Sequence, residues 1–101
     1  MSSKSVVKAV RVLSTILASV YGESEKPVSL RLAGGTLISF CVSTTKAAEV
    51  NRFVESKLAF IFGEKATSWS RLVKTEQPVW SVRTENVNGA CLVQIWFNIP
   101  A

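Results

Sequence analysis

The chain contains no histidine and no aspartate, and these absences remove most of the side chains that enzymes use for acid–base chemistry. Without histidine there is no Ser–His or Cys–His pair to activate a nucleophile. The seven acidic residues are all glutamates, and they are scattered along the sequence. A zinc site lacks ligands too, because the two cysteines do not form a CxxC spacing. We therefore expect a protein that is not an enzyme and that uses no metal or cofactor.

Cysteine and long apolar runs are also scarce. Cys41 and Cys91 both lie in apolar, strand-like segments, which favours buried thiols in a reducing compartment over a single disulfide. We accordingly expect a cytoplasmic protein. No stretch approaches the ~18 uncharged apolar residues of a transmembrane helix, so no membrane span is predicted. The basic start of the chain, followed by the apolar run 12–21, also resembles a targeting peptide, which is the alternative for this segment.

The size and composition favour a single domain with a binding role. A chain of 101 residues can form one domain, 1–101, with its own core. Apolar residues make up 48% of it. Either part of the apolar surface is covered by a partner protein or a second copy, or the core is well filled. The net charge of +5, from 12 basic and 7 acidic residues, favours polyanionic partners such as nucleic acid.

Two segments carry apolar residues at helical spacing, and they predict helices over 4–21 and 45–62. Gly22 and Gly63 are expected to end them, because glycine accepts the left-handed conformation that follows many helices. Phe53 and Phe60 are expected to widen the second buried stripe. The predicted buried stripes are Val6, Val10, Leu13, Leu17 and Val20 in the first helix, and Ala47, Val50, Val54, Leu58 and Ile61 in the second.

A first β-hairpin is predicted on either side of residues 33–35. Apolar and polar residues alternate over 28–32 and over 38–43, as in strands with one buried face. With 33–35 as a three-residue loop, Leu30 lies opposite Ile38 and Val28 opposite Phe40, so that both apolar sets share the core face.

A second hairpin is predicted over 79–85 and 91–99, because Asn88 and Gly89 form a strong type I′ turn signal. Pairing around that turn sets Val82 opposite Ile95 and Trp80 opposite Phe97. The side chains expected to point inward are Cys91, Val93, Ile95, Phe97 and Ile99, and those expected to point outward are Leu92, Gln94, Trp96, Asn98, Ser81, Arg83 and Glu85.

Two similar sequence segments lie at 17–23 and 58–64, 41 residues apart, and each ends in glycine and glutamate. The similarity indicates either a duplication, with repeats at 2–43 and 43–99, or two helices that end alike because they meet the same sheet. Both interpretations predict an α+β fold of order αββαββ, with an antiparallel sheet and both helices on one face. Residues 69–73 form either a further strand or a loop.

The favoured function is contact with nucleic acid. Cations placed to meet phosphates and an aromatic ring placed to stack on bases are the usual requirements. Arg31 and Arg83 are expected at equivalent outward positions on the sheet, with Trp96 beside them. The alternative without a binding role is that these charges are ordinary solvated residues and that Trp96 is covered by the segment 64–77 or by a second subunit. The candidate nucleic-acid-binding residues are Arg31, Arg83, Trp96, Lys4, Lys8, Arg11, Arg71 and Lys74.

The alternative function, nearly as strongly indicated, is a protein–protein interaction module: an adaptor, an inhibitor or an assembly subunit. It accounts better for the high apolar content, and it predicts a homodimer formed through the outer face of the sheet. The candidate interface residues are Trp69, Leu92 and Trp96, since aromatic residues are common in interface hot spots.

Overall fold

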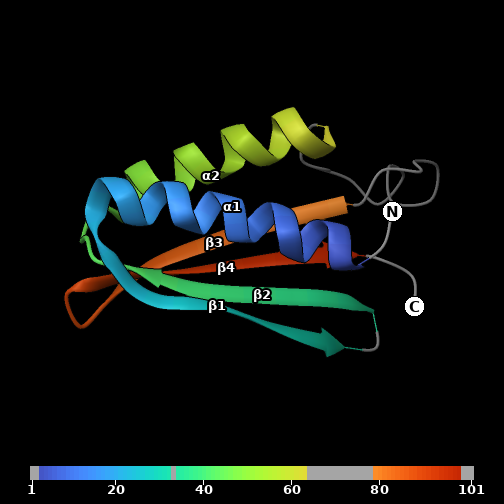
Figure 1. Cartoon of the computed structure of the whole chain (residues 1–101), viewed down its shortest axis with the longest axis horizontal. Coiled ribbons are helices and arrows are strands. Elements are labelled where there is room, and N and C mark those ends of the chain that lie inside the picture. The colour runs from blue at the N-terminus through green and yellow to red at the C-terminus, as the bar shows by residue number, and fades with distance from the viewer. Residues whose placement is uncertain (1–2, 33, 64–78, 99–101) are drawn as a thin grey trace.

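The computed structural model describes residues 3–32, 34–63 and 79–98, which form two helices and four strands (Figure 1). The α+β class, the two helices and the four-stranded antiparallel sheet are thereby confirmed. The segment 69–73, where a further strand or a loop was predicted, lies outside the described residues. In chain order the elements are α1 (Ser3–Tyr21), β1 (Glu23–Leu32), β2 (Gly35–Val42), α2 (Ala47–Phe62), β3 (Val79–Val87) and β4 (Ala90–Asn98).

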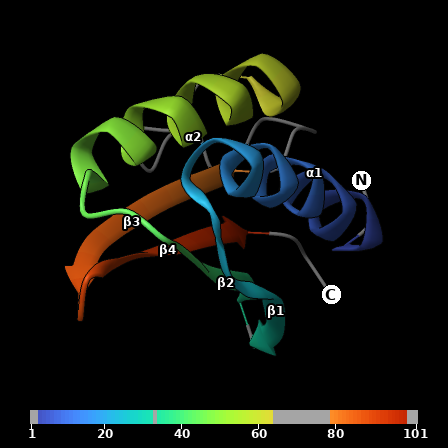
Figure 2. The same ribbon diagram turned by 60° about the vertical axis from the view of Figure 1, so that its left-hand side comes forward.

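The strands lie in the order β1-β2-β4-β3, and each neighbouring pair is antiparallel. Both helices lie over the same face of the sheet, side by side and running in opposite directions (Figures 1 and 2). We call this the helix face. The other face, which no described element covers, is the open face.

The core lies between the helix face of the sheet and one stripe of each helix. In the core Phe62 meets Phe97 edge to face, with ring centroids 5.3 Å apart. Within each helix the core residues recur every three or four positions, and within β2 and β4 they recur every second position, as helix and strand periodicity require. The buried apolar residues are Val6, Val10, Leu13 and Leu17 of α1, Val50, Val54, Leu58 and Phe62 of α2, and Ile38, Phe40, Val42, Trp80, Cys91, Val93, Ile95 and Phe97 of the sheet.

Both helical stripes are narrower than predicted. Val20 is 67% exposed and Ile61 is also exposed, so neither belongs to the core. Phe60 is 89% exposed, because it lies two residues from both Leu58 and Phe62 and therefore projects about 200° away from their buried direction. Phe62, which the sequence pattern did not single out, takes the last buried position of α2 instead.

The predicted helix ends are confirmed, and they are alike. Gly22 and Gly63 have φ of 99° and 88°, and each donates its N–H to the carbonyl four residues earlier, at 2.9 Å. At an offset of 41 residues the counterpart of β1 would fall at 64–73, outside the described residues. Duplication of the whole unit stays a prediction.

The second hairpin agrees with the prediction in register and in facing. Trp80 pairs with Phe97 and Val82 with Ile95. Asn88 and Gly89 both have positive φ, as a type I′ turn requires. The core residues of β4 therefore alternate with Leu92, Gln94, Trp96 and Asn98 on the open face; Ile99 lies outside the described residues.

The first hairpin differs from the prediction by one residue of loop. Leu32 pairs with Gly35, so the loop has two residues, and Leu30 pairs with Leu37 rather than with Ile38. Because a slip of one residue turns every side chain of a strand to the other face, Val28, Leu30 and Leu32 lie on the open face. Val28 is 68% exposed as a result.

Gly35 explains why the loop is short. A Cβ atom at Gly35 would overlap the carbonyl oxygen of Phe97 on β4 and would lie 2.8 Å from Cζ2 of Trp96. Glycine is therefore required here by the close approach of two strands, not by a turn. The sequence pattern assigned this glycine to the loop, which moved the whole predicted register.

No helix in the described parts of the chain is both long enough and apolar enough to cross a membrane.

Candidate anion-binding site between α1 and β1

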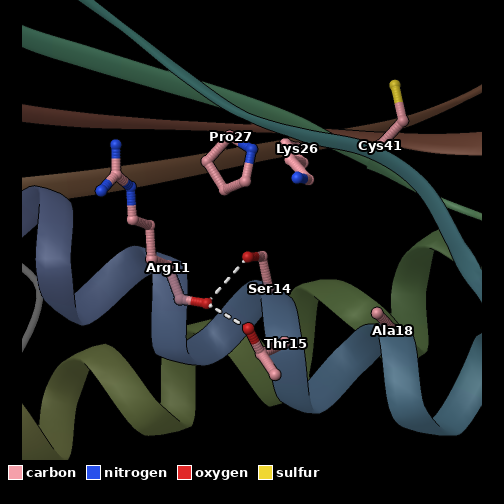
Figure 3. A pocket seen from close by; sticks show the side chains of 7 residues that line it. All are labelled: Arg11, Ser14, Thr15, Ala18, Lys26, Pro27 and Cys41. Atoms are coloured by element: carbon pink, nitrogen blue, oxygen red, sulfur yellow. Dashed lines mark hydrogen bonds between the residues drawn. The ribbon is translucent and has the colours of Figure 1, made fainter.

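A pocket of about 460 Å³ opens between α1 and β1 (Figure 3). Among the residues whose side chains the structure describes, its lining contains two cationic side chains, two hydroxyls and no acid. The lining residues are Arg11, Ser14, Thr15 and Ala18 of α1, Lys26 and Pro27 of β1, and Cys41 of β2.

The pocket lies where β1 departs from regular pairing. The β1–β2 register shifts between Glu25 and Val28, so that Lys26 and Pro27 have no paired residue on β2. Proline favours such an irregularity because it has no N–H to donate to a ladder. The local bend turns Lys26 and Pro27 toward the facing turns of α1, and the ring of Pro27 points back at the helix in Figure 3.

The polar groups of the pocket are arranged around Arg11. Its guanidinium points from α1 toward the strands (Figure 3). The hydroxyls of Ser14 and Thr15 both donate to the Arg11 carbonyl oxygen, at 2.9 and 3.0 Å. Their oxygens therefore remain acceptors on the pocket side, while Arg11 and Lys26 supply the donors and the positive charge. This combination suits a phosphate ester that carries a neighbouring hydroxyl.

Further cations extend the site along the same side of the molecule. Lys8 is exposed on α1 less than one helical turn before Arg11. Arg31 pairs with Thr36, whose side chain is buried on the helix face, so Arg31 belongs to that face as well. We call Lys8, Arg11, Lys26 and Arg31 the α1/β1 seam. Lys4 belongs to the first turn of α1, and the start of α1 lies at the same end of the molecule as the end of β1 (Figure 1).

The predicted strip of Arg31, Trp96 and Arg83 is not assembled. Arg31 faces the helices whereas Trp96 and Arg83 face the open side, because the register of the first hairpin is one residue away from the expected one. Arg83 also lies 3.8 Å from Glu85, which offsets part of its charge. The equivalence of Arg31 and Arg83 is therefore wrong, and the two cations that converge on one pocket are Arg11 and Lys26.

Trp96 and Leu92 lie on the open face, both half-buried. Trp96 pairs with Leu37, and its ring lies over Gly34 and Gly35. Trp96 forms an apolar patch on the open face with Val28, Leu30 and Leu32 of β1, whereas Leu92 lies four residues away along β4, opposite Cys41. Of the other predicted site residues, Trp69, Arg71 and Lys74 lie outside the described residues.

Sequence reasoning found Arg11 but missed Lys26 and the pocket. Lys26 lies before the range 28–32 that was predicted for the first strand, whereas β1 begins at Glu23 and already includes it. The signal that was present is the Lys26–Pro27 dipeptide, since proline in a strand marks an edge or a bulge.

Both cysteines are thiols, as expected, and they face opposite sides of the sheet. Cys91 is fully buried, and its burial raises the pKa of its thiol; the nearby Cys41 raises it further, by a smaller amount.

The two thiols are expected to differ in reactivity. Because the thiolate is the reactive form, we expect iodoacetamide at pH 8 to alkylate Cys41 at least about tenfold faster than Cys91. Peptide mass mapping over time checks this, and equal rates in the folded protein would contradict the assigned facing of β4.

Among the described residues, no three potential metal ligands of the histidine, cysteine and acid types come together. Comparison with known proteins adds no assignment: no family model, no curated protein and no solved structure matches the chain.

Proposed function

We propose that this protein binds nucleic acid through the α1/β1 seam, where it grips backbone phosphates. The observation that carries the proposal is that Arg11 from a helix and Lys26 from a strand converge on one pocket, beside two hydroxyls. A basic composition alone would not bring a lysine and an arginine from different elements to the same pocket. A pocket lined by two cations attracts an anion by geometry and charge together.

The chemistry of the seam suits a phosphate backbone better than a base edge. Arginine can meet two phosphate oxygens at once, and lysine serves as a compact point charge. Lys8 and Arg31 would engage the adjacent phosphates, and the hydroxyl oxygens of Ser14 and Thr15 would accept from a sugar hydroxyl. About three to four phosphates would be engaged. A plot of the logarithm of the association constant against the logarithm of the salt concentration then has a slope of about −3 for a duplex.

The test is a titration of labelled single- and double-stranded oligonucleotides by fluorescence anisotropy at several salt concentrations. We expect the double variant Arg11→Glu, Lys26→Glu to lose at least about thirtyfold in affinity at low salt, because two phosphate contacts become repulsive. The matched control is Arg52→Glu, Lys57→Glu on the exposed side of α2, which changes net charge equally. We expect it to lose only a few-fold.

Two outcomes would contradict the proposal. If both double variants weaken binding equally, attraction follows net charge and the seam is not a site. If the unmodified protein binds no oligonucleotide at low salt, nucleic acid is not its partner.

A specific observation also supports the second candidate function, a protein–protein interaction module. Val28, Leu30 and Leu32 are exposed in a row on one face of β1, which is an edge strand. Large apolar side chains on an exposed edge favour association with another chain.

A further inference from the structure

The outer edge of β1 is open in the described structure. β1 is the end strand of the sheet and pairs only with β2. Its first half is irregular, with two register shifts and Pro27, and such features protect an edge from association. From Val28 to Leu32, however, the strand is regular, and its open-face side chains are all apolar.

The pairing with β2 determines which backbone groups remain available. In an antiparallel ladder, residues that bond the neighbouring strand alternate with residues that turn away from it. Since the ladder closes at Leu32 and Gly35 across a two-residue loop, Val28, Leu30 and Leu32 bond β2. Ser29 and Arg31 therefore turn their N–H and carbonyl groups to the outer edge.

One register pairs this edge with a second copy of itself better than the neighbouring ones. With Leu30 opposite Leu30 of the second copy, Val28 lies opposite Leu32, and Ser29 exchanges both backbone bonds with Arg31. Apolar side chains then meet apolar side chains along the open face. A shift of the register by two residues, which moves the twofold axis by one residue, sets Arg31 against Arg31 in one direction and Leu32 against Lys26 in the other.

We propose that two copies of this chain pair antiparallel through the outer edges of β1, with Leu30 on the twofold axis, to form one continuous eight-stranded sheet. The interface is isologous, as a twofold dimer requires. The axis stands perpendicular to the sheet, so both helix layers lie on the same side and the two α1/β1 seams flank the axis. This inference goes beyond the proposed function and does not depend on it.

The interface is small, because it consists of four backbone hydrogen bonds and three pairs of apolar side chains. Interfaces below the standard size form weak dimers, and the dimer carries twice the chain's net charge of +5. We therefore expect self-association in the micromolar range that strengthens as salt is added, since salt screens the repulsion between two basic copies.

The first test is sedimentation equilibrium of the full chain without nucleic acid, over a wide range of protein concentration. Ser29→Pro removes an N–H that points to the outer edge and leaves the bonds to β2 in place, so we expect it to weaken dimerisation at least about tenfold. Circular dichroism confirms that the variant is folded. A sample that stays monomeric at every concentration and salt level would overturn the proposal.

The second test is disulfide trapping in a Cys41→Ser background, and it remains informative if Ser29→Pro does not fold. Residues opposite each other in a non-hydrogen-bonded pair have Cα atoms about 4.5 Å apart, within the range of a disulfide. We expect Leu30→Cys to form a covalent dimer on mild oxidation.

Val28→Cys is the matched control, since it lies on the same face and is at least as exposed. In the proposed register its two copies are about 13 Å apart, too far for a disulfide. We expect at least a tenfold lower yield than for Leu30→Cys. Equal yields would indicate random collision, and a preference for Val28→Cys would indicate another register; either result overturns the proposal. Because no oligonucleotide is present, these outcomes are separate from those of the binding test.

Discussion

Replacing Gly35 by alanine is expected to destabilise the protein by about 3 kcal/mol or more, among the largest effects of any single methyl group in the chain. The new Cβ would overlap the Phe97 carbonyl oxygen and press on Trp96 at 2.8 Å. The Phe97 backbone cannot move aside, because β4 is held by β2 on one side and by β3 on the other. Urea denaturation followed by circular dichroism measures the loss.

Gly34→Ala is the matched control for Gly35→Ala. Its Cβ would meet only Cζ2 of Trp96, at 3.8 Å, which is ordinary van der Waals contact. We expect a change below about 1 kcal/mol at this position. If the two variants were equally stable, Gly35 would belong to the loop, and the originally expected register of the first hairpin would be correct.

Replacing Trp80 by alanine is expected to cost about 3–5 kcal/mol, the range for removing a large buried aromatic side chain. Trp80 is only 2% exposed, and its indole Nε1 donates to the carbonyl of Gly63, at 3.0 Å. The indole therefore fills the core beside Phe97, its partner on β4, and also fixes the end of α2 to β3. In a chain of this length such a loss lowers the melting temperature by about 15 °C or more.

Trp80→Phe separates the two contributions of Trp80. Phenylalanine keeps much of the buried volume but leaves the Gly63 carbonyl without its donor, so we expect an intermediate loss of about 1–2 kcal/mol. Thermal unfolding of the three proteins in parallel gives the comparison. A Trp80→Ala variant as stable as the unmodified chain would show that Trp80 does not belong to the core.

The sequence allowed accurate prediction where a local signal was decisive. Asn88 and Gly89 permit one turn type, and that turn set the whole register of β3 and β4. The helices followed from their apolar spacing, and Gly22 and Gly63 marked their ends. The first hairpin was mispredicted because residues 33–35 are compatible with two loop lengths. The choice between them depends on the contact of Gly35 with Phe97, which lies far away in the sequence.

The candidate site depended on the same non-local information. Arg11 was identified from its place in a basic stripe, but its significance comes from Lys26, which joins it across the pocket. No spacing rule predicts that pair, since it exists only because β1 bends at Pro27 toward α1. Arg31 was identified for a sound chemical reason and assigned to the wrong face, because the facing of β1 depended on the loop length.

The position of β4 has a consequence for how this chain folds during synthesis. β4 is the last of the described elements to leave the ribosome, yet it lies in the middle of the sheet, between β2 and β3. Until it arrives, Ile38 and Phe40 lack their neighbours on that side, and β2 presents an unpaired edge. The core and the sheet of the nascent chain therefore cannot be completed before residue 98 has been translated. Until then the unpaired edge of β2 exposes the chain to misassociation.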